Sequence, residues 1–244
     1  MTENETPYIA ALPMYDWPER RGEVDAEWAA IRDRLRMAGV DAPDGLTRAD
    51  DLHGQWRSPD LLLGQTCWGP MGCGVADHVQ VLAQPSYNGI EGGQGDFYSG
   101  AVVMRRGEPG VENLAVTGGA QLPLDLMRGR RFVYNSPDSM SGLLGLKRDL
   151  EAVGESLNLF SAHLESGSHR NSVKLIAEGE ADVGVIDCRS WTLAKRYEPE
   201  AAATLKVAGW TSLRKGLPFI TARWTPPAVV TALRDALAEI ADRA

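Results

Sequence analysis

The chain has 244 residues, of which 43% are hydrophobic and 24% are charged, and its formal net charge at pH 7 is −8. This length is enough for one large domain or two small ones, and the composition is ordinary for a globular protein. Because no basic run offsets the excess of acidic residues, we expect neither nucleic acid nor an acidic membrane surface as a partner.

The first part of the chain alternates strand-like and helix-like segments. Residues 8–15 (YIAALPMY) predict a short buried strand, and residues 16–39 predict a helix with Trp28, Ile31 and Leu35 at helical spacing. Further strands are predicted at 60–68, 79–85 and 97–106. The glycine-rich GPMGCG follows the strand at 60–68.

The second part of the chain continues this alternation. Strands are predicted at 130–135, 158–166 and 181–187, and helices at 139–154 and 169–179. A strand at 216–224 and an amphipathic helix at 226–244 end the chain. This order predicts α/β layers with mostly parallel sheets in two lobes. In such folds ligands bind beyond the carboxyl ends of the strands.

The N-terminal residues and the cysteines bear on the compartment. The segment MTENETPYIAALPMYD has neither the basic stretch nor the apolar core of a signal peptide, and the apolar runs are too short to cross a bilayer. The chain has three cysteines, Cys67, Cys73 and Cys188. Their odd number and the lack of zinc-finger spacing predict reduced thiols and no metal. We therefore expect a cytoplasmic protein without membrane insertion, or a periplasmic one if an export signal has been removed.

The segment YNSPDSMSG, residues 134–142, joins a predicted strand to a predicted helix. Ser139 can cap that helix, and the backbone N–H groups of Met140, Ser141 and Gly142 lie in its first turn. These donors, the serine hydroxyls and the helix dipole favour an anion. An ordinary N-cap with nothing bound is the alternative, and these residues alone leave both open.

Two further polar residues stand at strand-to-helix corners of the same lobe. In SGSHRNSVKLIAEGEADVGVID, residues 166–187, His169 begins a predicted helix and Asp187 ends a predicted strand. Either residue alone is explained as a cap. Three corners that carry hydroxyls, a histidine and a carboxylate are less readily explained by three independent caps.

These two segments and GWTSLRKGLPFIT, residues 209–221, closely resemble the phosphate/phosphonate-type substrate-binding proteins of ABC transporters. LPMYDWPE, LLLGQTCWGPM and FYSGAVVMR are similar to the first lobe of the same family, so the resemblance covers nearly the whole chain. It implies a type II periplasmic-binding-protein fold, with two α/β lobes of mixed sheets flanked by helices and joined by a two-segment hinge. The first lobe would be 1–101 with 217–244, the second 102–216, and the hinge segments would lie near 98–106 and 211–220.

The resemblance also implies a ligand site in the cleft between the lobes. Ser139, the Met140 amide and Ser141 would hold an oxyanion, His169 would donate to it, and Asp187 would accept from a proton-bearing group of the ligand. The facing wall and the hinge strand would supply Tyr15, Gln65, Thr66, Trp68 and Tyr98. The implied function is capture of phosphate, a phosphonate or a phosphorylated metabolite by a monomer, without a cofactor, for an ABC transporter permease.

Other functions remain as alternatives at this point. Serine, histidine and aspartate are the residue types of a hydrolase triad, but the Gly-x-Ser-x-Gly elbow is missing. A lyase or biosynthetic enzyme of the same fold, acting on a small anionic metabolite in the cytosol, is favoured by the lack of an export signal. A cytosolic sensor module is a third alternative, although no partner domain is fused to the chain.

Overall fold

The computed structural model describes residues 8–107 and 117–241, which fall into two compact units. The first unit contains the chain up to Ser86 and from Gly216 onward, and the second runs from Tyr87 to Lys215. Residues 87–101, expected in the first lobe, thus belong to the second unit. The reason is long-range pairing, because the strands between 93 and 105 pair with partners inside 183–215.

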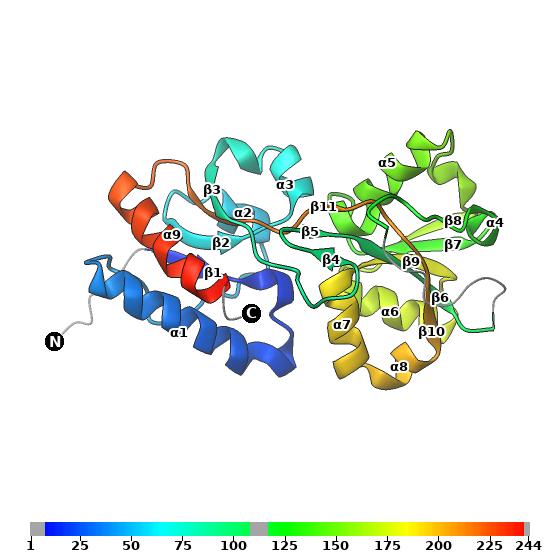
Figure 1. Cartoon of the computed structure of the whole chain (residues 1–244), viewed down its shortest axis with the longest axis horizontal. Helices are drawn as coiled ribbons and strands as arrows, with labels where there is room; N and C mark the ends of the chain where they lie inside the picture. The colour runs from blue at the N-terminus through cyan, green and yellow to red at the C-terminus, as the bar shows by residue number, and fades with distance from the viewer. Residues whose placement is uncertain (1–7, 108–116, 242–244) are drawn as a thin grey trace. The chain divides into compact units, whose positions relative to one another are not determined.

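The first unit contains a four-stranded mixed sheet in the order β1-β2-β12-β3 (Figure 1). β1 (Ile9–Ala11) is parallel to β2 (Leu61–Gln65), whereas β12 (Phe219–Ala222) is antiparallel to both β2 and β3 (Val79–Ala83). β12 enters from the end of the chain and lies between two strands from its beginning. The sheet is therefore complete only when both pieces of the chain are present.

Helices cover this sheet on two sides. α1 (Arg21–Met37) and α9 (Pro227–Ala241) bury Trp28, Ile31 and Leu233 in one apolar cluster with Leu63 of β2. α2 (Leu52–Trp56) and α3 (Trp68–Gly72) contribute to a second cluster around Ile220. The predicted helical stripe of α1 is thus the stripe that is buried.

The second unit has a five-stranded mixed sheet in the order β10-β6-β9-β7-β8. β7 (Arg131–Tyr134) is parallel to β8 (Ala162–Glu165) and to β9 (Val183–Asp187). β6 (Gly100–Arg105) is antiparallel to β9 and to the edge strand β10 (Leu205–Trp210). A separate three-stranded sheet joins β4 (Gly93–Gln94), β5 (Phe97–Tyr98) and β11 (Arg214–Lys215).

The helices of the second unit follow its strands. α4 (Leu124–Met127) and α5 (Gly145–Ala152) pack on the apolar cluster that contains Phe132 and Val185. α6 (His169–Glu178) packs on β9, where a side chain on Gly184 would meet Ile176. α7 (Cys188–Tyr197) and α8 (Pro199–Ala203) lead into β10.

Several elements differ from the predicted ones. The strand predicted at 8–15 ends at Ala11 and continues as a 3-10 turn, Pro13–Tyr15. The strand predicted at 97–106 is broken at Ser99 into β5 and β6, which belong to different sheets. Trp68, expected to end a strand, begins α3. The two main sheets are mixed, which confirms what the family resemblance implied and corrects the mostly parallel sheets predicted from the alternation of elements.

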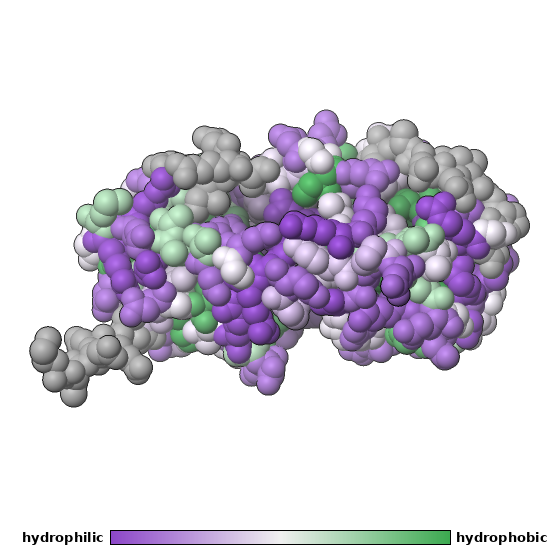
Figure 2. All heavy atoms as spheres, turned by 90° about the horizontal axis from the view of Figure 1, so that it is seen from below, coloured by the Kyte–Doolittle hydropathy of each residue, from purple (hydrophilic) through white to green (hydrophobic). Residues whose placement is uncertain are grey.

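Figure 2 shows mainly hydrophilic residues on the face it presents, with hydrophobic residues in small scattered groups. Among the described residues, no helix has the length and apolar composition needed to span a membrane.

Candidate functional site

The segment after β7 forms an unusual turn. Ser139 has an extended backbone and caps the following helix, because its Oγ accepts a hydrogen bond from the Gly142 amide at 3.0 Å. Residues Met140–Leu144 are not α-helical but form a π-helical turn, after which α5 begins at Gly145. Such wide turns are rare and are frequent at functional sites. The predicted cap at Ser139 is therefore present, and the predicted α-helix starts later than expected.

The serine turn and the start of α6 meet through side chains. The Oγ atoms of Ser139 and Ser141 are 3.4 Å apart, and Ser141 Oγ is 2.9 Å from Nε2 of His169. Both serines are buried. We call Ser139, Ser141 and His169 the serine–histidine row. The sequence predicted all three residues, and the structure brings them together from two different strand-to-helix corners.

His169 is held neutral by its surroundings. It is the first residue of α6, behind the N-cap Ser168, and burial lowers the pKa of its imidazole to about 4. Its Nδ1 is shielded from solvent and has no hydrogen-bond partner among the described residues. At neutral pH the ring therefore carries one proton, and the tautomer decides which nitrogen donates.

The row can offer several hydrogen bonds to an anion. Ser139 Oγ already accepts from Gly142, which leaves its O–H group as a donor. The backbone N–H of Ser141, like that of Met140, lies in the first turn of a helix, where a helix supplies no acceptor. Hydroxyl and amide donors at the positive end of a helix dipole are suited to an oxyanion and need no formal positive charge, and ligand contacts at these residues remain predictions.

Asn135 is a residue of this turn that the sequence reasoning missed. A Cβ on Gly142 would lie 1.9 Å from Oδ1 of Asn135, so the asparagine occupies the space where a side chain would stand. This Oδ1 is buried and has no hydrogen-bond partner within the described chain. The absence of a side chain at Gly142 thus makes room for Asn135. The position of Asn135 directly after a strand was the available signal.

Asp187 ends β9, as predicted, and is 1% exposed. Its Oδ1 accepts from the Ser190 amide at 2.9 Å and so caps α7. In the sheet Asp187 pairs with Gly100, and a side chain on Gly100 would come within 3.1 Å of the Ser141 carbonyl oxygen. Asp187 is thus a cap at the strand end that lies beside the serine turn, and its contact with a ligand remains a prediction.

Tyr98 lies in the small sheet of the second unit. Tyr98 is buried in β5, and its ring stacks on the Tyr87 ring, with the two ring centroids 5.4 Å apart. Aromatic packing within the unit therefore accounts for the position of Tyr98. A ligand contact at Tyr98 remains a prediction.

Four predicted residues belong to the first unit. Tyr15 ends the 3-10 turn after β1, and its carbonyl accepts from Arg20. Gln65 ends β2, and Thr66 bonds through its amide to the Pro218 carbonyl at 3.1 Å. Trp68 donates its indole N–H to the Gly216 carbonyl at 2.7 Å. These contacts fasten the Gln65–Trp68 turn to the segment before β12, and ligand contacts here remain predictions.

The class of protein follows from comparison with known families. Residues 73–244 match the sequence model of the family described as "ABC transporter, phosphonate, periplasmic substrate-binding protein", and the chain therefore belongs to this family. The family consists of solute-binding proteins rather than enzymes, so the hydrolase, lyase and biosynthetic alternatives are not favoured. No curated relative matches the chain.

Solved structures show the same two-lobed periplasmic-binding-protein fold. PhnD1 from Prochlorococcus marinus, in complex with methylphosphonate, is 16% identical with a TM-score of 0.69, and the match covers 94% of this chain and 84% of that one. XAC2383 from Xanthomonas citri, bound to chloride, is 17% identical with a TM-score of 0.67, covering 95% and 83%. The binding-protein component PA3383 of a Pseudomonas aeruginosa phosphonate transporter is 16% identical with a TM-score of 0.64, covering 95% and 74%.

Proposed function

We propose that this protein captures a small phosphorus oxyanion, such as a phosphonate or phosphate, through the serine–histidine row. The observation that carries the proposal is the continuous contact from the Gly142 amide through Ser139 and Ser141 to His169. Hydroxyls fixed in this way are pre-oriented, so little conformational entropy is lost when a ligand binds. Family membership supports the ligand class, and the methylphosphonate named for PhnD1 is the natural first probe.

Calorimetry with methylphosphonate tests this proposal. Ser139→Ala and Ser141→Ala each remove one hydrogen bond to a charged group, which is worth about 1.5–3 kcal/mol, so each should weaken binding about tenfold or more. Ser136→Ala is the matched control, because the Ser136 hydroxyl donates to Asp138 in the same loop at 2.8 Å and lies outside the row. Equal affinity in the wild type and both row variants would reduce the turn to an ordinary cap.

We further propose that the protein delivers its ligand to an ABC transporter permease and works in the periplasm. The support is the family description, which names both the transporter and the compartment. This differs from the cytoplasmic expectation drawn from the N-terminal residues. Fractionation of cells that express the full-length gene tests the compartment, and recovery only with cytosolic markers would contradict it.

A further inference from the structure

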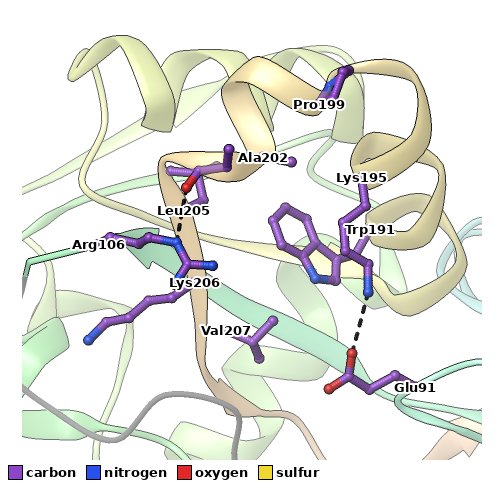
Figure 3. Close-up of a pocket in the computed structure, with 10 residues that line it drawn as sticks. Glu91, Arg106, Trp191, Lys195, Pro199, Ala202, Leu205, Lys206 and Val207 are labelled. Carbon is purple, nitrogen blue, oxygen red and sulfur yellow. Dashed lines mark hydrogen bonds and ion pairs between the residues drawn. The ribbon is translucent and has the colours of Figure 1, made fainter.

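The second unit has a cavity of about 300 Å³ that is not lined by any residue of the serine–histidine row. α7, α8 and β10 enclose it, and residue Glu91 closes one side (Figure 3). Its apolar lining comes from Trp191, Ala202, Leu205 and Val207. Trp191 and Lys195 are four residues apart on α7, so they share the helix face that borders the cavity.

Trp191 carries a donor that the protein does not use. The residue is only 4% exposed, yet its indole N–H has no acceptor among the described residues. By contrast, the indole N–H groups of Trp28, Trp56 and Trp68 bond to backbone carbonyls. The indole nitrogen is not among the shielded polar atoms without a partner, so it reaches the surface of the cavity, where it can donate to an acceptor from outside.

Lys195 is a cation that lies beside Trp191 in this cavity. Arg106 also lines it, but its guanidinium donates to the Ala203 carbonyl at 3.0 Å, and Lys206 alternates along β10 with Leu205 and Val207, so its side chain leaves on the other face of the strand. Lys195 Nζ lies 3.4 Å from a Glu91 carboxylate oxygen, and both side chains are close to half exposed, so this pair is weak and open to exchange. Figure 3 shows this pair beside the Trp191 ring.

We propose that this cavity is a second ligand site, for a small carboxylic acid with an apolar body. The carboxylate accepts hydrogen bonds from the Trp191 indole and from Lys195, where it replaces Glu91. The apolar body lies on Leu205 and Val207. A phosphorus dianion suits the site poorly, because its extra charge would face Glu91 and apolar walls rather than further donors.

Nitrogen-15 NMR of the tryptophan indoles tests the proposal with benzoate as the probe. Trp191→Phe identifies the Trp191 signal by its loss. Titration of the wild type with benzoate should shift that signal, while the signals of Trp28, Trp56 and Trp68 stay fixed because their N–H groups are already bonded. A titration that leaves the Trp191 signal unmoved would overturn the proposal.

Two charge variants separate the site from a general electrostatic effect. Lys195→Gln should weaken benzoate binding about tenfold, because a charge-assisted hydrogen bond is lost. Arg196→Gln removes the same charge one position further along, where the guanidinium lies over the Tyr197 ring instead of in the cavity, and should leave the affinity unchanged. Equal weakening in both variants would also overturn the proposal. Both variants should bind methylphosphonate as the wild type does. A failure of the benzoate test would therefore leave the proposed function untouched.

Discussion

Gly142 has no room for a side chain, and this makes it a sensitive position in the serine turn. Gly142→Ala would place its Cβ 1.9 Å from Asn135 Oδ1, so Asn135 or the turn must shift. We expect a loss of about 1–3 kcal/mol in the free energy of unfolding, together with weaker methylphosphonate binding. Urea denaturation and calorimetry measure the two effects.

Gly22→Ala is the control for this substitution. Gly22 lies in α1 with nothing within 4 Å of an added Cβ, and it has no positive φ. We expect this change to leave stability unchanged or to raise it by less than about 1 kcal/mol, because Gly22 is the second residue of α1 and the full cost of glycine applies to a helix interior. If Gly142→Ala were as harmless as Gly22→Ala, the close contact with Asn135 would not be present in solution.

The lowered pKa of His169 predicts a pH dependence of stability. The folded value is about 4, whereas an unfolded histidine titrates near 6.5, so below pH 6.5 the unfolded state takes up the proton first. The fold should therefore lose stability as the pH falls from about 6.5 toward 4, by about 2 kcal/mol at pH 5. His169→Gln should remove this part of the loss, which denaturant curves at pH 7 and pH 5 would reveal. Identical pH slopes in both proteins would contradict it.

Asp187 provides a prediction about ligand choice. A carboxylate beside a bound anion repels it unless a proton lies between them, and a phosphonate or phosphate can keep a P–OH at neutral pH whereas sulfate cannot. We therefore expect the wild type to bind methylphosphonate and reject sulfate. Asp187→Asn preserves the cap on Ser190, because the side-chain amide oxygen also accepts a hydrogen bond. This variant should reduce the difference between the affinities for methylphosphonate and for sulfate. Tight sulfate binding by the wild type, measured by calorimetry, would show that Asp187 does not face the anion.

Among the elements, α5 is fixed by an ion pair directly behind the serine turn. The Arg214 guanidinium donates to both carboxylate oxygens of Asp149, at 2.6 and 3.1 Å, and to the Gly145 carbonyl. Ser212 adds two further hydrogen bonds to Asp149. This contact joins the start of α5 to the segment that leads into β11.

Arg214→Ala should destabilise the fold by about 3–5 kcal/mol, because the buried Asp149 carboxylate keeps its hydrogen bonds from Ser212 but loses the cation that balances its charge. Lys147→Ala is the comparison on the same helix. The Lys147 Nζ atom lies 4.0 Å from Oε1 of Glu151, and both side chains are more than half exposed. This ion pair should therefore contribute less than about 1 kcal/mol to stability. Thermal unfolding of both variants measures the difference, and similar losses would show that the Arg214 contact has no special role.

The elements also show what a sequence can predict and what it cannot. α6 was predicted at 169–179 and spans His169–Glu178, because both of its ends carry local signals: Ser168 caps the start, and Gly179 takes a positive φ after the end. The break at Ser99 has no such signal, since it depends on which distant strands pair with β5 and β6. For residues 188–210 the sequence reasoning named no element, and α7, α8 and β10 lie there.

The same distinction holds for the candidate site. The serine–histidine row was predictable, because each member stands at a strand-to-helix corner and polar residue types at such corners are informative. The contact between Asn135 and Gly142 was not predictable, because it depends on the path of a π-helical turn, and no residue pattern predicts such a turn. The cavity beside Trp191 also escaped prediction, since α7, α8 and β10, which line it, were not recognised in the sequence.

For the molecule as a whole, the two units differ in how the chain builds them. The second unit is one continuous stretch, Tyr87–Lys215, whereas the first needs two separated pieces. A fragment of residues 87–215 should therefore fold alone and give a dispersed NMR spectrum with cooperative thermal unfolding. A fragment of residues 1–86 should not, because it lacks β12 between β2 and β3 and lacks α9 on the core. Folding of the N-terminal fragment alone would contradict this reading of the sheet.

The place of β12 in the first sheet also sets the order in which the protein can form during synthesis. The ribosome delivers β2 and β3 early, but their shared neighbour arrives only after residue 219 has been made. By then every strand of the second unit has already been translated. The unit that begins the chain is therefore the last to close. β1 and β2 can pair early, but β2 and β3 lack their shared neighbour for more than half of the synthesis of these 244 residues.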